Sequence, residues 1–144
     1  MHVSPTAVSN SVGELKENAL IKIEKTKTIN FISFNRDNQA VVNLKRVKNL
    51  ENRYVSGLLD YLNKNIPCGT VILFGSYSRG EDTSTSDIDI GVMTANKKRL
   101  DLSKFEKKLS RRIQLSLFIK REVSNEFFNN IINGIVLKGF LKNE

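Results

Sequence analysis

The order of apolar and polar residues predicts strands placed between helices. Thr70–Phe74 is a short, β-branched apolar run that ends at Gly75, which is typical of a buried strand. Asp87–Ile90 and Ile113–Ile119 alternate between polar and apolar positions, as half-buried strands do. The polar residues after Gly75 can begin a short helix. These patterns predict a chain that contains both helices and strands.

Apolar residues at helical spacing mark the flanking helices. Between Asn38 and Asn65 they recur at steps of three and four residues, which predicts one long helix or two contiguous ones that end near Pro67. The residues of this stripe are Val41, Leu44, Val47, Leu50, Tyr54, Leu58, Tyr61 and Leu62. We also expect helices over Leu102–Leu109 and Ser124–Asn133, and a short final strand at Ile135–Leu137.

The first residues of the chain follow a different pattern. Ser4 and Pro5 are suited to the N-cap and first position of a helix. Val8, Val12, Leu15 and Ala19 would form its apolar stripe. Residues 20–25 and 28–34 then predict two short strands around a basic turn that includes Lys25 and Lys27.

Composition limits the classes of protein that fit. The chain has 144 residues, is 40% hydrophobic and carries a net charge of +8, which suits one ordinary core plus a small appendage. Cys68 is the only cysteine, so a disulfide framework is excluded and we expect a reducing cytoplasm. We find no signal peptide and no apolar run long enough for a membrane, so no membrane partner is expected.

The positive charge is densest between residues 97 and 112. This segment holds Lys97, Lys98, Arg99, Lys104, Lys107, Lys108, Arg111 and Arg112, against Asp101 and Glu106. Such a run is usually the solvated face of a helix. The alternative is a track for an acidic partner such as nucleic acid.

The candidate chemistry lies between Phe74 and Val92. A Gly75-Ser76 turn after a strand can expose amide groups to an anion, and the hydroxyls of Ser76 and Ser78 can add contacts. Alternation places Asp87 and Asp89 on one strand face, roughly 7 Å apart, which allows them to bind a hard cation such as Mg²⁺. The segment therefore combines a phosphate-binding turn with a metal-binding pair.

This segment resembles the motif of minimal nucleotidyltransferases, small members of the DNA polymerase β superfamily. The resemblance rests on Gly75-Ser76, Arg79-Gly80 and Ser86–Ile90. It implies an α+β fold with a small mixed sheet flanked by helices, Mg²⁺ or Mn²⁺, and transfer of a nucleoside monophosphate from a triphosphate, with ATP expected, to a hydroxyl. Asp87 and Asp89 would be the catalytic metal ligands. The triphosphate would be bound by Gly75, Ser76, Ser78, Arg79 and Ser86.

One departure affects catalysis. Catalytic relatives carry a third carboxylate on a neighbouring strand, whereas the matching strand here offers Gln114 or Ser116. A neutral amide contributes no charge and cannot act as a base. Glu81, Asp82 or Glu106 could supply the missing charge only if the fold brought one of them into the site. Nucleotide binding is therefore better supported than turnover.

The N-terminal helix and hairpin resemble the recognition helix and wing of a winged helix-turn-helix domain, whose recognition helix enters the DNA major groove. A complete winged helix needs two earlier helices, and this sequence begins almost at the recognition helix. We therefore expect either that the start of the sequence is internal to a longer product, or that the segment is a remnant that serves as an interface, for example in a homodimer. We expect residues 1–36 as this segment, residues 37–66 as a connecting helix packed on the next domain, and residues 67–144 as the nucleotidyltransferase domain.

Three functions remain open at this point. The first is a nucleotidyltransferase whose acceptor hydroxyl lies on a protein or nucleic acid. Some relatives are antitoxins that adenylylate a tyrosine of a helical toxin, so a toxin is one expected partner. The second is a catalytically degenerate nucleotide sensor, and the third is a DNA-binding regulator.

Overall fold

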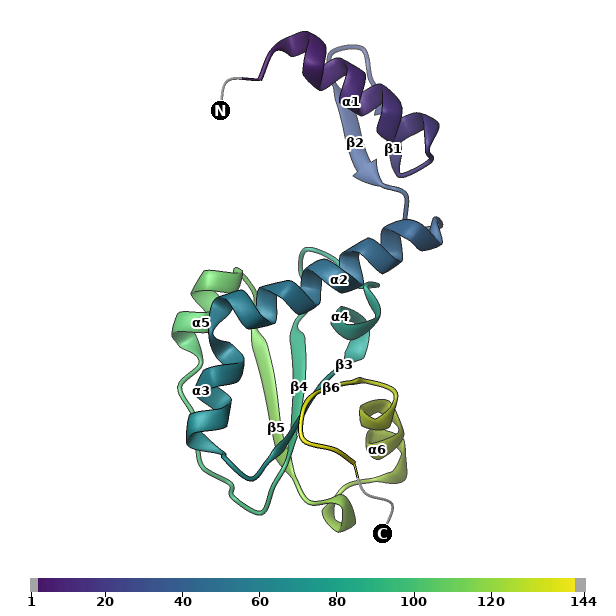
Figure 1. Ribbon diagram of the computed structural model, residues 1–144. Coiled ribbons are helices and arrows are strands. Elements are labelled where there is room, and N and C mark those ends of the chain that lie inside the picture. The colour runs from purple at the N-terminus through teal and green to yellow at the C-terminus, as the bar shows by residue number, and fades with distance from the viewer. Residues whose placement is uncertain (1–2, 142–144) are drawn as a thin grey trace. The chain divides into compact units, whose positions relative to one another are not determined.

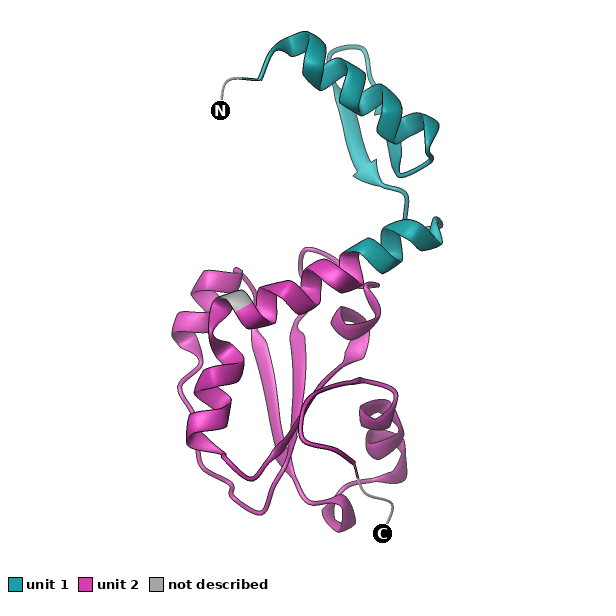
Figure 2. Ribbon diagram, in the orientation of Figure 1, with its two compact units in different colours: residues 1–44 teal, residues 45–144 magenta. Residues whose placement is uncertain are grey.

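The computed structural model describes residues 3–141, apart from the side chain of Val55. The chain divides into two compact units, residues 1–44 and residues 45–144 (Figure 2). Helix α2 (Gln39–Ser56) contains the boundary between them. Within residues 3–141, no helix combines the length and the apolar character that crossing a membrane requires.

Unit 1 consists of one helix, one hairpin and the first residues of α2. Helix α1 (Pro5–Glu17) begins at the expected N-cap, where Ser4 accepts a hydrogen bond from the Ala7 amide at 3.2 Å. Strands β1 (Ile21–Lys25) and β2 (Asn30–Phe34) pair antiparallel, as the sequence predicted. The predicted stripe was partly wrong, because Ala19 lies beyond α1 in a left-handed conformation with φ of 53°.

Unit 1 buries few apolar side chains. Only Ile21 and Val41 are buried among the described hydrophobic residues of this unit, and α1 contains no buried residue. Polar contacts stabilise the segments that connect its helices and strands. The side-chain Nδ2 of Asn35 donates to the Ala19 carbonyl at 2.8 Å, and Lys22 pairs with Asp37 at 2.6 Å.

Unit 2 contains the mixed sheet that the sequence led us to expect. Its strand order is β5-β4-β3-β6, with β4 and β5 parallel and the other pairs antiparallel. The strands are β3 (Thr70–Phe74), β4 (Ile88–Met93), β5 (Ile113–Phe118) and β6 (Ile135–Lys138). The connecting helices are α3 (Leu58–Asn65), α4 (Gly75–Arg79), α5 (Ser103–Leu109) and α6 (Asn125–Ile132), with a 3₁₀ turn at Lys120–Glu122 (Figure 1).

The stretch predicted as one long helix or two is divided at Gly57. This residue has φ of 77°, which favours glycine, and it separates α2 from α3. Leu58 and Leu62 of the predicted stripe are buried. Three other residues of the stripe on α2, Leu44, Val47 and Tyr54, are exposed, whereas Leu50 packs against the core.

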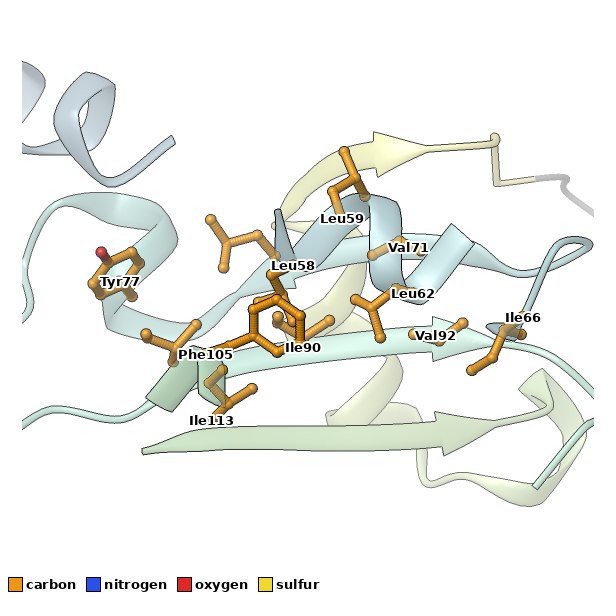
Figure 3. Close-up of a cluster of buried hydrophobic side chains, with 12 residues drawn as sticks. Leu58, Leu59, Leu62, Ile66, Val71, Tyr77, Ile90, Val92, Phe105 and Ile113 are labelled. Carbon is orange, nitrogen blue, oxygen red and sulfur yellow. The ribbon is translucent and has the colours of Figure 1, made fainter. Parts of the chain in front are cut away.

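Each face of the sheet has its own apolar layer. On one face, side chains of α3 and α5 pack against β3, β4 and β5, with Phe105 and Ile90 near the centre (Figure 3). On the other face, Ile131 of α6 packs on Ile72 and Phe118. Each buried leucine or isoleucine contributes about 1.5–3 kcal/mol to folding, so both layers fix how the strands pair.

Candidate functional site

The candidate site begins where β3 ends and β4 starts. Phe74 and Asp89 are partners in the antiparallel register, so the turn at Gly75 lies beside the Asp89 side chain. Gly75 has φ of 71°, and a Cβ atom built there would overlap the Asp89 carboxylate far inside van der Waals contact. Only glycine fits this position, because the carboxylate occupies the space that a side chain would need.

Asp87 and Asp89 lie on the same side of the sheet. Ile88 and Ile90, which alternate with them, are buried in the opposite layer, with 0% and 1% of their surfaces exposed. Both aspartates are half-buried. Burial raises the pKa of Asp89, the Asp87 charge raises it further, and Arg79 opposes both effects. Two adjacent carboxylates that repel each other in a partly dehydrated place suit an oxygen-binding divalent cation.

The residues predicted to bind phosphate fall into two groups. Ser76 is half-buried at the start of α4, and Arg79 is exposed and pairs with Glu81 at 2.7 Å. Ser78 is buried, and its hydroxyl donates to the Gly75 carbonyl at 2.8 Å. The Ser86 hydroxyl accepts a hydrogen bond from the Thr83 amide at 2.9 Å. Ser78 and Ser86 therefore also stabilise the turn and the loop that follows it.

The loop between α4 and β4 is held by Arg111. Its Nη1 atom donates to the carbonyl oxygens of Thr83 and Ser86, the latter at 2.9 Å. Its Nη2 atom lies 3.1 Å from Oδ2 of Asp82. These contacts connect the segment before β5 to the residues that lead into Asp87, and they fix where β4 begins.

Asp82 is the centre of a buried polar cluster, which we call the Asp82 cluster and which contains Asp82, Asn49, Lys45 and Arg111. The Asp82 side chain is 1% exposed and lies 3.2 Å from Lys45 Nζ. Asn49 Nδ2 donates to Asp82 Oδ1 at 2.8 Å and to the Tyr77 carbonyl at 2.9 Å. One face of α2 thereby holds both α4 and the loop.

Sequence reasoning missed the role of this cluster. The available signal was the polar spacing of Lys45, Asn49 and Arg53, which places three polar side chains on one face of a predicted helix. The guanidinium of Arg53 is buried and lies 4.7 Å from the Tyr77 ring centre. Within the described chain, none of its nitrogen atoms forms a hydrogen bond of normal distance and angle. Burial lowers the pKa of Arg53, and its polar contact with Tyr77 opposes this effect.

Among residues 3–141, no third carboxylate joins the aspartate pair. Gln114 is the register partner of Asp89 on β5, and Ser116 is the partner of Gly91. Partners in adjacent strands project to the same face, so Gln114 is the neighbour of Asp89. Glu106 accepts a hydrogen bond from the Ile113 amide at 2.9 Å, Glu81 pairs with Arg79, and Asp82 lies in its own cluster. Residues 3–141 contain no group of three or more metal-binding side chains.

Comparison with known families agrees with this geometry. The model for the polymerase β nucleotidyltransferase domain matches residues 57–139, more than half of the chain. The chain belongs to this family. The matched region contains the Gly75 turn, both aspartates and Gln114. No curated protein matches the chain.

Proposed function

We propose that this polymerase β family protein binds a nucleoside triphosphate together with Mg²⁺ or Mn²⁺ at the Gly75 turn and the aspartate pair. The observation that carries the proposal is the packing of the Asp89 carboxylate against Gly75, beside the like charge of Asp87. A cation would relieve the repulsion between the two carboxylates, and the absence of a side chain at Gly75 would allow phosphate oxygens to approach the backbone of the half-buried turn.

Each residue would have a distinct role. Asp87 and Asp89 would hold the cation, whose chemistry is to neutralise charge on the transferring phosphoryl group. Gly75 and Ser76 would contact phosphate through the backbone and a hydroxyl, and Arg79 would add positive charge near Asp89. Ser78 and Ser86 would keep the turn and the loop in place.

The reaction that suits this site is transfer of a nucleoside monophosphate, with ATP as the expected donor. The acceptor hydroxyl oxygen would bond to the α-phosphorus, the bond to the β-phosphate would break, and pyrophosphate would leave with the electron pair. The acceptor would be a hydroxyl of a protein, such as a partner toxin, or of a nucleic acid. The acceptor proton would pass to a carboxylate or to water.

The position of Gln114 favours a second candidate function, which is nucleotide sensing without turnover. An uncharged amide lies beside Asp89, where a carboxylate would complete a two-metal site. Two-metal catalysis places ions about 3.5–4 Å apart, and their repulsion must be offset by anionic ligands. With two carboxylates instead of three, a single cation and its triphosphate can bind while the acceptor hydroxyl is not activated.

Calorimetry and a labelling assay separate these functions. We would titrate ATP, GTP, CTP and UTP into the protein with Mg²⁺ or Mn²⁺, and repeat the titration with Asp87→Asn and Asp89→Asn. Loss of nucleotide affinity in both variants is expected. Unchanged affinity would show that Asp87 and Asp89 do not bind the metal ion. Labelled nucleotides in cell extract then test transfer. Binding without any labelled product would identify a sensor.

Unit 1 carries a separate proposal, contact with DNA. Lys25 and Lys27 are exposed at the end of the β1-β2 hairpin, a position that a winged-helix wing would occupy beside a duplex. We expect a mobility shift that weakens with salt and with Lys25→Glu or Lys27→Glu. Absence of a shift at low salt would exclude this role.

A further inference from the structure

A basic hollow lies beside β5, apart from the aspartate pair. It has a volume of about 850 Å³, and its floor is formed by Ile113, Leu115 and Leu117. An adjoining hollow of about 540 Å³ shares Glu106 and Arg112 with it. We call the two together the β5 groove. Since side chains alternate along β5, its floor lies on the sheet face opposite Gln114 and Asp89.

The groove runs along an unpaired edge of the sheet. In the described part of the chain, β5 is the terminal strand of the sheet and pairs with β4 alone. The carbonyl oxygens of Arg112 and Phe118 accept hydrogen bonds from Ile88 and Thr94, at 2.9 and 2.8 Å, so the even-numbered main-chain groups of β5 face the neighbouring strand. The odd-numbered groups therefore face outward.

Two residues of β5 present open main-chain groups to the groove. The outward Ile113 amide already donates to Glu106. For the outward amide and carbonyl groups of Leu115 and Leu117, no partner is recorded among residues 3–141. Their side chains are half-buried on the floor of the same groove. An added strand would find hydrogen-bonding groups and apolar contacts at alternate positions here.

The rim of the groove is positively charged. Lys97 pairs with Glu122, and Lys98 donates to Asn65. Arg99 and Arg112 are exposed on the rim, and no ion pair is recorded for either of them in the described part of the chain. The nearby Asp101 and Glu106 carboxylates accept hydrogen bonds from backbone amides of Ser103 and Ile113. The rim thus carries unbalanced cationic side chains.

We propose that the β5 groove binds an extended polypeptide in which acidic and apolar residues alternate, as an added strand beside β5. Its amides and carbonyls would pair with Leu115 and Leu117, and its acidic side chains would meet Arg99 and Arg112. A second copy of this chain is disfavoured, because edge-to-edge pairing would bring two basic rims together. Single-stranded nucleic acid is also disfavoured, since no aromatic side chain lines either described hollow to stack with bases.

Selection of displayed random peptides on the full chain tests this proposal. We expect enriched peptides to alternate acidic and apolar residues, and their synthetic forms to bind in a salt-dependent way. Arg99→Glu combined with Arg112→Glu should lower the affinity for the tightest-binding peptide at least about tenfold at low ionic strength. Lys16→Glu combined with Arg46→Glu makes the same charge change on exposed residues elsewhere and should leave affinity unchanged.

N-methylation of the peptide distinguishes strand addition from simple charge attraction. Methyl groups on the amides that face β5 should abolish binding, whereas methyl groups on the alternate amides should not. Equal loss at both sets of positions, or full binding to the doubly charge-reversed variant, would overturn the proposal. Binding of an oligonucleotide that depends on Arg99 and Arg112 would also overturn it. The Asp89→Asn variant should bind the peptide with unchanged affinity, so the peptide test does not depend on nucleotide binding.

Discussion

Arg111 Nη2 lies 3.1 Å from Asp82 Oδ2, in an ion pair that joins the segment before β5 to the loop before β4. The Asp82 side chain is almost wholly buried, and Lys45 and Asn49 contact its other oxygen. This contact holds the loop that leads into Asp87. The shape of the candidate site therefore depends on a carboxylate that lies outside it.

We expect Asp82→Ala to lower the free energy of unfolding by about 3–5 kcal/mol, because it leaves Lys45 and Arg111 without their buried partner. Denaturant unfolding of the purified protein measures this loss. Glu51→Ala removes an exposed carboxylate that pairs with Lys48 and should cost less than about 1 kcal/mol. Equal losses in the two variants would contradict the structural role of Asp82.

Gly75→Ala should abolish nucleotide binding and destabilise the protein by about 1–3 kcal/mol, because the residue has positive φ and no space for Cβ. Calorimetry and denaturant unfolding measure the two effects. Gly13→Ala in α1 is the matched control, since nothing lies within 4 Å of its Cβ position. In that variant the free energy of unfolding should rise by about 0.5–1 kcal/mol, because alanine favours a helix more than glycine does, and nucleotide binding should be unchanged.

Asp89→Asn should stabilise the protein above the acidic range while nucleotide binding is lost. The folded state raises the pKa of Asp89 above its ordinary value of 3.8, so the folded chain holds that proton more tightly than the unfolded chain. The free energy of unfolding therefore falls as pH rises from about 3.8 through the raised pKa. Solvent screening keeps this effect small, because the carboxyl is only half-buried.

Thermal unfolding of both proteins across this pH range checks the sign. The difference between Asp89→Asn and the original protein should grow with pH and then level off. A difference that shrinks as pH rises would mean that the folded state stabilises the charged carboxylate. Added Mg²⁺ should raise the unfolding temperature of the original protein and not that of the variant.

Gln114→Glu should introduce the carboxylate that the site lacks. Gln114 is the register partner of Asp89. A glutamate at this position can bind a second cation and can take the proton from the hydroxyl group that receives the nucleotide. We expect labelled transfer to rise about 100-fold or more with Mn²⁺ or Mg²⁺. Gln39→Glu makes the same chemical change on an exposed residue of α2 and should leave the rate of labelled transfer unchanged. No gain with any triphosphate would argue against this arrangement.

Arg53→Met should leave the free energy of unfolding unchanged or raise it by about 1–4 kcal/mol, since a buried guanidinium without recorded hydrogen bonds is costly to desolvate. Methionine can keep the contact with the Tyr77 ring. Denaturant unfolding measures the change. A loss of more than about 2 kcal/mol would show that the cation-π contact with Tyr77 outweighs the cost of burial.

The strands were predictable because each carries its own local pattern. β3 is an apolar run that ends at a glycine, and the residues that lead into β4, Asp87–Ile90, alternate acids with isoleucines. Both patterns identify a strand without knowledge of its partners. The break between α2 and α3 follows from Gly57, although the sequence left one or two helices open. Exposure of Leu44 and Val47 could not be predicted. Helical spacing shows that apolar side chains share one face of a helix, but it does not show whether another part of the molecule covers that face.

The sequence alone determined the family motif, the shared direction of Asp87 and Asp89, and the absence of an acid at residues 114 and 116, since spacing and side-chain period are local properties. Only the tertiary structure decided that Gln114 lies beside Asp89, that Asp82 belongs to a buried ion pair, and that β5 has an open edge. These relationships join residues far apart in the chain. They depend on strand order and register, which packing of the two apolar layers selects.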